Sequence, residues 1–207
     1  MSPSSDRAVI LAPDRVDDIV DVMADGFFGY PVMRWVAGGD RAADLPARER
    51  RLIELFVRRR LRRGGPAFGV FQEGALAGAA ILTVPREPEA PADVAVLTDD
   101  TWRALGDEAR RRYDIYAAAA NFFDAVGPHH HLNMIAVRHA YKGQGLARPL
   151  LDGVCALAQA DAGSSGVSLT TENPKNVELY RHFGFEVIAE AEPCPDFKTW
   201  GMFRRIG

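Results

Sequence analysis

Three consecutive histidines, His129, His130 and His131, stand directly before an apolar stretch that runs to Val137. The pKa of free histidine is about 6.5, so most of its imidazole is neutral at pH 7 and able to accept a proton. Such a group can act as a general base for a nucleophile that must lose a proton before it attacks. The alternative interpretation is a histidine cluster at the end of a strand, with no chemical task.

The segment "KGQGLA", residues 142–147, follows that stretch and precedes an amphipathic helix expected over residues 145–162. Gly143 and Gly145 can adopt positive φ and let the backbone approach a ligand. The first N–H groups of the helix lack partners within it and lie at the positive end of its dipole. The turn is therefore a candidate diphosphate site, although an ordinary glycine-rich turn has the same composition.

A second helix start carries another candidate group. Asn173 precedes Pro174, which is typical of an N-cap followed by a proline in the first turn. Tyr180 follows two turns later, and its phenol has a reference pKa near 10, so it keeps a proton that it can donate to a developing anion. Its alternative role is that of a core aromatic beside Val177 and Phe183.

The elements that position these residues follow from apolar periodicity and turn residues. Strands are expected at 7–12, in a hairpin over 67–85, up to Val137, and at 166–172, 185–192 and 199–205; helices at 13–28, 47–63, 99–126, 145–162 and 173–183, with a loop or broken helix at 29–40 and a proline-rich loop at 86–93. This order predicts one α/β domain over residues 1–207. Period-two alternation puts His129, His131, Asn133, Ile135 and Val137 on one strand face.

The composition is that of an ordinary globular chain. Apolar residues make up 47% of 207 residues, charged residues make up 26%, and the formal net charge is −3, which gives no electrostatic reason to expect nucleic acid or an anionic membrane. We find no membrane-length apolar run, no secretory signal pattern and no metal-site spacing around Cys155 and Cys194. These observations predict a cytoplasmic protein without a metal.

Taken together, the two motifs resemble the GNAT superfamily of acyl-CoA-dependent N-acetyltransferases. The pyrophosphate loop of that family reads Gln or Arg, two variable residues, Gly, one variable residue, then Gly or Ala; here Lys142 takes the first place, followed by Gly145 and Ala147. The family's second element has an Asn, then a Tyr and a Gly-Phe pair, matched here by these residues: Asn173 or Asn176, Tyr180, Gly184 and Phe185. A looser likeness to puromycin N-acetyltransferase-like members lies in residues 27–36 and 184–205.

The resemblance implies an α/β (α+β) GNAT fold, in which helices flank a mixed, mostly antiparallel sheet of six to seven strands that splays at a β-bulge. It implies acetyl-CoA as the acyl donor and, as the acceptor, a primary amine of a small molecule that attacks the thioester directly. The residues implied to bind CoA are Ile135, Ala136, Val137, Lys142, Gly143, Gln144, Gly145, Leu146, Ala147, Arg148, Asn173, Asn176 and Tyr180.

For catalysis, the resemblance makes Tyr180 the acid that protonates the leaving thiolate. His131 stands where many family members carry their base, with His129 as a relay through water. Glu172 competes for the same role, because it lies two residues from Thr170, the position at which puromycin-acetylating relatives have a glutamate. The base therefore stays open among His131, Glu172 and water.

Aromatic and other large apolar residues are expected to line the acceptor pocket: Phe27, Phe28, Tyr30, Met33, Trp35, Tyr113 and Tyr116. Their number favours an acceptor with apolar or aromatic character, and the alternative role of each is ordinary core packing. Two alternatives remain, a protein or peptide N-acetyltransferase and a non-catalytic acyl-CoA-binding module. The sequence leaves the acceptor, the acyl length and the oligomeric state open, a homodimer included.

Overall fold

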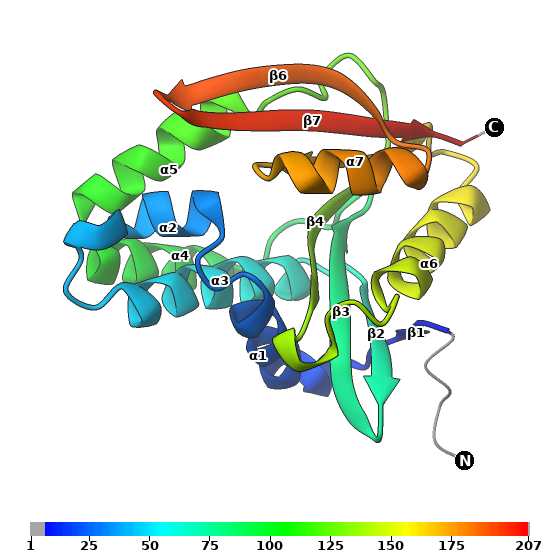
Figure 1. The fold of residues 1–207 in the computed structure, drawn as a ribbon, viewed down its shortest axis with the longest axis horizontal. Coiled ribbons are helices and arrows are strands. Elements are labelled where there is room, and N and C mark those ends of the chain that lie inside the picture. The colour runs from blue at the N-terminus through cyan, green and yellow to red at the C-terminus, as the bar shows by residue number, and fades with distance from the viewer. Residues whose placement is uncertain (1–6, 207) are drawn as a thin grey trace.

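The computed structural model describes residues 7–206, in which seven strands form one sheet in the order β1-β2-β3-β4-β5-β7-β6 (Figure 1). Only the β4–β5 pair is parallel. The prediction of a mixed, mostly antiparallel sheet is therefore confirmed. The strands are β1 (Val9–Ile10), β2 (Ala67–Gln72), β3 (Ala75–Thr83), β4 (His130–Val137), β5 (Gly166–Thr171), β6 (Glu186–Cys194) and β7 (Phe197–Arg205).

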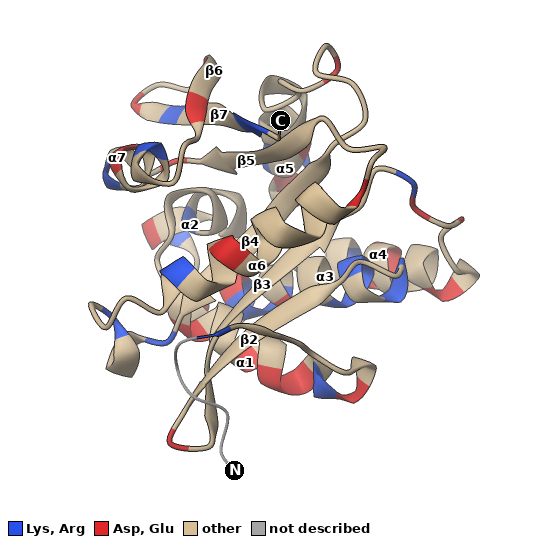
Figure 2. Ribbon diagram, turned by 90° about the vertical axis from the view of Figure 1, so that its right-hand side faces the viewer, with Lys and Arg blue, Asp and Glu red and all other residues tan. Residues whose placement is uncertain are grey.

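Helices cover both faces of the sheet: α1 (Val16–Gly26), α2 (Pro31–Ala37), α3 (Leu45–Arg62), α4 (Ala92–Leu105) and α5 (Asp107–Ala119) on one face, α6 (Ala147–Ala160) and α7 (Pro174–His182) on the other. Strands β2 to β5 contain no Asp, Glu, Lys or Arg, as expected for strands covered on both sides (Figure 2). Among residues 7–206, no helix combines the length and the apolar character that crossing a membrane requires.

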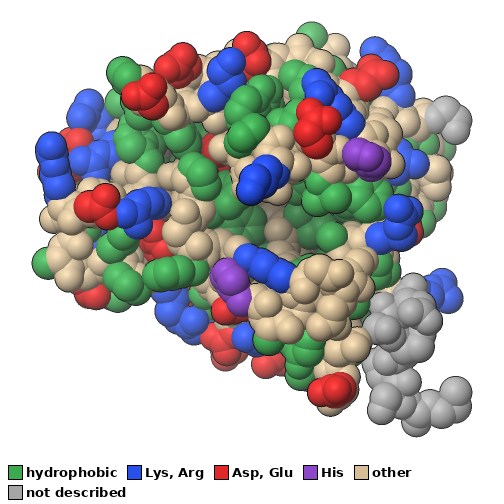
Figure 3. Space-filling view, in the orientation of Figure 1, with side chains coloured by type: hydrophobic (Ala, Val, Ile, Leu, Met, Phe, Trp, Pro, Cys, Tyr) green, Lys and Arg blue, Asp and Glu red, His purple; other side chains and the backbone are tan. Residues whose placement is uncertain are grey.

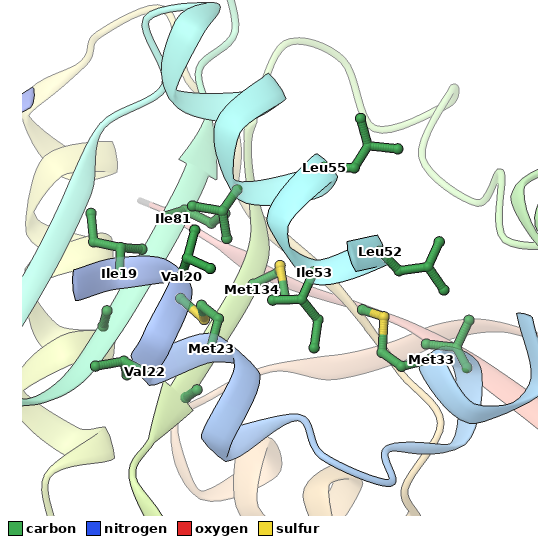
Figure 4. Packing of buried hydrophobic residues seen from close by; sticks show 14 of the residues in the cluster. Ile19, Val20, Val22, Met23, Met33, Leu52, Ile53, Leu55, Ile81 and Met134 are labelled. Atoms are coloured by element: carbon green, nitrogen blue, oxygen red, sulfur yellow. The ribbon is translucent and has the colours of Figure 1, made fainter. Parts of the chain in front are cut away.

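Apolar residues at helical spacing fasten the first face to the sheet. Ile19 and Met23 of α1 and Ile53 of α3 are buried against Ile81 of β3 and Met134 of β4 (Figure 4). Burying one such side chain stabilises the fold by about 1.5–3 kcal/mol, so this cluster holds α1 and α3 in fixed positions. These two helices form the support beneath the functional site.

A β-bulge in β4 confirms the predicted splay of the sheet. Ile81 of β3 pairs with Met134, whereas the next residue, Leu82, pairs with Leu132, so Asn133 is an extra residue in β4. Strand β4 pairs with β5 only at residues 130–132, although β4 continues to Val137. Beyond that point the two parallel strands separate and leave space between them.

The bulge also changes which face each β4 side chain occupies. Leu132 packs in the core cluster beneath α6, while Met134 and Ala136 pack in the cluster beneath α1 to α5. Because neighbouring side chains alternate, His131 lies on the face opposite Leu132 and so shares the face of Met134. The predicted common face for His131 and Ile135 is wrong, since simple alternation ignores the extra residue.

Several predicted boundaries are wrong for reasons of backbone conformation. The helix expected over 99–126 is two helices separated by Gly106, whose φ of +87° does not fit a right-handed helix, and residues 120–129 are not helical. Helix α6 begins at Ala147 and not at Gly145, because the φ of Gly145 is +78°. Helix α4 begins inside the expected loop 86–93, α2 occupies part of 29–40, and β1 is shorter than expected.

Candidate functional site

A cavity of about 590 Å³ lies where β4 and β5 separate. Its wall includes residues 135–137 of β4, Thr170 of β5, Glu172 just after β5, and Tyr180 of α7, together with side chains from α1, α2, α3 and α5. Figure 3 shows its mouth as a hollow with hydrophobic side chains at its centre, on the face that carries α7. The cavity therefore joins the two sides of the sheet.

Glu172 is a buried carboxyl group in the wall of this cavity, with a residue exposure of 7%. Tyr116 Oη and Thr199 Oγ1 each donate a hydrogen bond of 2.8 Å to its Oε1. Its backbone N–H donates to Tyr30 Oη at 3.1 Å. Burial raises the pKa of Glu172 above its usual 4.5, although these hydrogen bonds act in the opposite direction. One carboxyl oxygen of Glu172, Oε1, thus accepts both side-chain hydrogen bonds, and these fix the position of the carboxyl group.

Tyr180 lies on α7, whose start has the predicted cap. Asn173 accepts a hydrogen bond of 3.0 Å from the backbone N–H of Lys175, and Pro174 follows it in the first turn. The ring of Tyr180 packs against Phe185 with centroids 5.8 Å apart. Burial, and to a smaller extent the charge of Glu172, raise the pKa of Tyr180, so its hydroxyl keeps its proton at neutral pH.

His131 lines the same cavity at the end where β4 and β5 are still paired. Its Nδ1 lies 2.7 Å from Ser168 Oγ, and its ring centroid lies 5.4 Å from that of Phe123. Burial, followed by the charges of His129 and Arg60, lowers the pKa of His131 to about 4. His131 is therefore neutral at pH 7 and a weaker base than a free histidine.

His129 is a partly exposed residue outside the cavity lining. Its Nδ1 lies 2.7 Å from the carbonyl oxygen of Gly127, and its ring packs near Phe123 and Phe203. The structure does not bring it to the cavity as the predicted relay requires.

The glycine turn has the conformation that a diphosphate site needs. Gly143 and Gly145 have φ values of +81° and +78°, and no neighbouring atom lies within 4 Å of where a Cβ would stand on either. Within residues 7–206, no backbone carbonyl accepts a hydrogen bond from the N–H groups of residues 143–147. Lys142 Nζ, which lies 2.9 Å from His139 Nε2, adds a positive charge beside them. These residues fit a phosphate group bound by main-chain donors.

The residues expected to bind CoA divide into two groups. Those that line the cavity are Ile135, Ala136, Val137, Lys142, Ala147, Asn173, Asn176 and Tyr180; those that do not are Gly143, Gln144, Gly145, Leu146 and Arg148. Leu146 is buried in the core beneath α6, and the guanidinium of Arg148 lies 5.0 Å from the ring centroid of Phe183. In the described part of the chain, no three His, Cys, Asp or Glu side chains are grouped to hold a metal ion.

Most of the aromatic and other large apolar residues expected around the acceptor line the cavity: Phe27, Phe28, Tyr30, Met33, Tyr113 and Tyr116. Trp35 does not, because its ring stacks on Phe197 at 5.4 Å. The sequence interpretation missed Arg59 of α3, since a run of arginines on a helix is normally a solvated face, and it missed Thr199, which only the pairing of β7 with β5 brings near Glu172.

The comparison with protein families matches residues 32–185 to the acetyltransferase (GNAT) family, a stretch that includes β4, the glycine turn and Tyr180. Three solved structures are similar to this chain over nearly their full lengths. A structure described as a histone acetyltransferase and related acetyltransferase from Corynebacterium glutamicum has 19% identity and a TM-score of 0.67, covering 97% of this chain and 96% of its own.

The other two come from insects. Polyamine N-acetyltransferase of Drosophila melanogaster has 14% identity and a TM-score of 0.61, covering 95% of this chain and 98% of its own. Arylalkylamine N-acetyltransferase 2 from Aedes aegypti has 13% identity and a TM-score of 0.60, covering 97% and 99%. At these identities the likeness establishes the shared fold.

Proposed function

The chain belongs to the acetyltransferase (GNAT) family, whose members use acetyl-CoA as acyl donor, and we propose that it acetylates the primary amine of a small molecule. The observation that carries this proposal is the single cavity that joins Glu172 and Tyr180 at the point where β4 and β5 separate. We further propose that residues 1–207 act as one domain in the cytoplasm; the free thiols of Cys155 and Cys194 support a reducing compartment.

On the donor side, we assign the pyrophosphate to the N–H groups of residues 143–147 and to the charge of Lys142. The support is their lack of backbone acceptors within residues 7–206 and the open space around Gly143 and Gly145. The separated part of β4, residues 135–137, would then receive the pantetheine and thioester, with Asn173 and Asn176 on the opposite wall. Acetyl-CoA supplies the activated acyl group.

On the acceptor side, we assign proton transfer to Glu172 and not to His131. A primary amine arrives as an ammonium group with a pKa near 10, and each pKa unit between it and its base costs about 1.4 kcal/mol. A histidine with a pKa of about 4 would leave a gap near 8 kcal/mol, and it offers the cation no negative charge. Glu172 has a raised pKa, which narrows the gap, and its carboxylate attracts the ammonium.

The ammonium group first gives one proton to the Glu172 carboxylate, which releases it to solvent. The neutral nitrogen then bonds to the acetyl carbonyl carbon and gives a second proton to Glu172 as the carbon–sulfur bond breaks. Tyr180 donates its proton to the departing sulfur, and the second proton returns from Glu172 to Tyr180 by way of solvent. The products are the acetamide and the free CoA thiol, and both side chains end in their starting states.

The shape of the acceptor side supports a small amine in preference to a protein. Aromatic rings from the segment between α1 and α2 and from α5 enclose it, including Phe27 and Tyr30, whose centroids lie 5.0 Å apart. Such a wall suits an acceptor with an apolar body.

Release of free CoA thiol from acetyl-CoA, measured over aminonucleosides, polyamines, arylalkylamines and amino acids, tests the proposal. The decisive variant is Tyr180→Phe, which keeps the ring against Phe185 and removes only the hydroxyl. We expect turnover to fall about 10- to 10³-fold with little change in the KM for acetyl-CoA, since one proton donor is lost. Binding of acetyl-CoA without thiol release for any amine would instead favour a non-catalytic binding module.

A further inference from the structure

Arg59 gives the acceptor side a positive charge that no carboxylate of the described chain neutralises. It lines the cavity from α3, and its Nη2 donates to Tyr113 Oη at 3.4 Å, while its guanidinium lies 5.8 Å from the ring centroid of Phe56. Its neighbours Arg58 and Arg60 both form ion pairs with carboxylates. Within residues 7–206, Arg59 forms no such pair, although it is only partly exposed.

The opposite charge lies further along the same wall. Tyr113 holds Arg59, and Tyr116 donates to Glu172 at 2.8 Å. The two tyrosines are three residues apart on α5, so they are neighbours on one face of that helix, with about 5–6 Å between their Cβ atoms. One helix face thus connects a cationic group to an anionic group across an aromatic surface.

We propose that the acceptor is a zwitterionic amino acid-like molecule, with its ammonium group at Glu172, a carboxylate at Arg59, and an apolar or aromatic spacer between them. This inference rests on the proposed function and names the substrate class for it. The planar guanidinium of arginine matches a carboxylate through two parallel hydrogen bonds. A bound carboxylate also supplies the counter-charge that Arg59 lacks in the described chain, which lowers the cost of holding this cation in a partly buried wall.

Arg59 is badly placed to serve the acyl donor. It lies on α3, among the helices on one face of the sheet, whereas the glycine turn leads into α6 on the other face. The phosphate groups expected at that turn would therefore lie on the far side of the sheet from Arg59.

Matched acid and amide pairs test the inference. The probes are para-(aminomethyl)benzoate against para-(aminomethyl)benzamide, and β-alanine and longer straight-chain ω-amino acids against their amides. Binding to the CoA-loaded protein is measured by calorimetry, and acetylation by thiol release. We expect at least one acid to exceed its amide about tenfold or more in affinity and in kcat/KM, as charge-assisted hydrogen bonds exceed neutral ones by this order.

Variants of α3 assign that preference to one residue. Arg59→Gln should bring the acid-to-amide ratio close to one, and Arg59→Lys, which keeps the charge without the planar fork, should restore part of it. Arg51→Gln is the matched control, since Arg51 is exposed on the same helix and does not line the cavity. Should Arg59→Gln fail to fold, the Arg59→Lys ratio still decides, because it must fall below that of the parent.

The outcomes separate the two claims. Acids that bind in preference to amides but are not acetylated would support the binding site and overturn the proposed function. Acetylation in which amides equal or exceed acids in every pair would overturn the inference and leave the proposed function standing. Absence of binding for every acid, or an acid preference unchanged in Arg59→Gln and Arg59→Lys, would also overturn the inference.

Discussion

The two sides of the cavity present different parts of the chain to their ligands. The side near α6 offers main-chain N–H groups from one contiguous segment, residues 143–147, and the only ionisable side chain beside them in the turn is that of Lys142. The side near α1 to α5 offers side chains that come from separate helices and strands, with Glu172, Arg59 and the ion-paired Arg60 as its charged groups. One side therefore depends on backbone conformation and the other on the identity of single side chains.

This difference implies different sensitivities to mutation. A backbone site tolerates many side chains as long as the φ values and the open space persist, whereas a side-chain site loses its function with one charge. Substitutions that change one of these properties and leave the other intact can therefore test the difference between the two sides.

The largest effect is expected for Glu172→Gln. Glutamine keeps the shape and an oxygen that can accept from Tyr116 and Thr199, but it cannot take the amine proton, so kcat/KM should fall about 10³-fold. The KM for acetyl-CoA should stay near the parent value in steady-state assays. Burial raises the pKa of Glu172, which means that its charged form is less stable in the folded protein than in the unfolded chain. Above that raised pKa the charge therefore lowers the stability of the parent. The neutral glutamine avoids this cost, so the variant should melt no lower than the parent at pH 7.

The pH profile sharpens the same test. The parent rate should fall as pH drops through the raised pKa of Glu172, where the carboxylate becomes protonated, and this limb should vanish from any residual activity of the variant. Glu190→Gln, on β6 and outside the cavity, is the control for loss of a carboxylate. Retained activity in Glu172→Gln would return the role of base to His131 or water.

The same contrast explains how far the sequence could predict the site. The glycine turn and the Asn173-Pro174 cap depend on residues within a few positions of each other, so a local pattern suffices. The family resemblance marks Glu172 as one candidate base, but the hydrogen bonds that hold it come from Tyr116 and Thr199, which lie 56 and 27 residues away in the chain. Nothing local marks which of these side chains will meet.

The position of the bulge shows a second limit. A family resemblance predicted that β4 would carry a bulge, but the extra residue is set by the register with β3, which pairs Leu82 with Leu132 and Ile81 with Met134. No feature of Asn133 itself marks it. Without that register, alternation assigns His131 to the wrong face, and the same error would misplace any side chain before the bulge.

A smaller effect is expected for Gly145→Asp on the backbone side. The aspartate would bring a negative charge to the expected diphosphate, so the dissociation constant for CoA should rise about 100-fold in calorimetry. Because residue 145 has a positive φ, the aspartate side chain also strains the backbone and destabilises the variant by about 1–2 kcal/mol. Gly127→Asp is the matched control, because Gly127 has a φ of +73°, open space around its Cβ position and no place in the cavity. Equal CoA affinities in the two variants would contradict the loop assignment.

The smallest effect concerns stability on the side-chain face, and it depends on His131. Its pKa is lowered from 6.5 to about 4 because the fold buries the ring, so the folded protein binds this proton less tightly than the unfolded chain does. The stability that comes from keeping His131 neutral is complete above pH 6.5 and is lost as the pH falls toward 4. This loss in the free energy of unfolding is at most about 3 kcal/mol, because the ring lines a cavity that water can enter. Urea unfolding at pH 7 and pH 4.5 measures this loss, and it should be smaller in His131→Asn, which can still bond Ser168. His182→Asn, an exposed histidine outside the cavity, gives the loss that belongs to the rest of the protein. If the parent and His131→Asn lose equal stability, His131 binds its proton as tightly in the fold as in the unfolded chain, and the argument that favours Glu172 over it as the base fails.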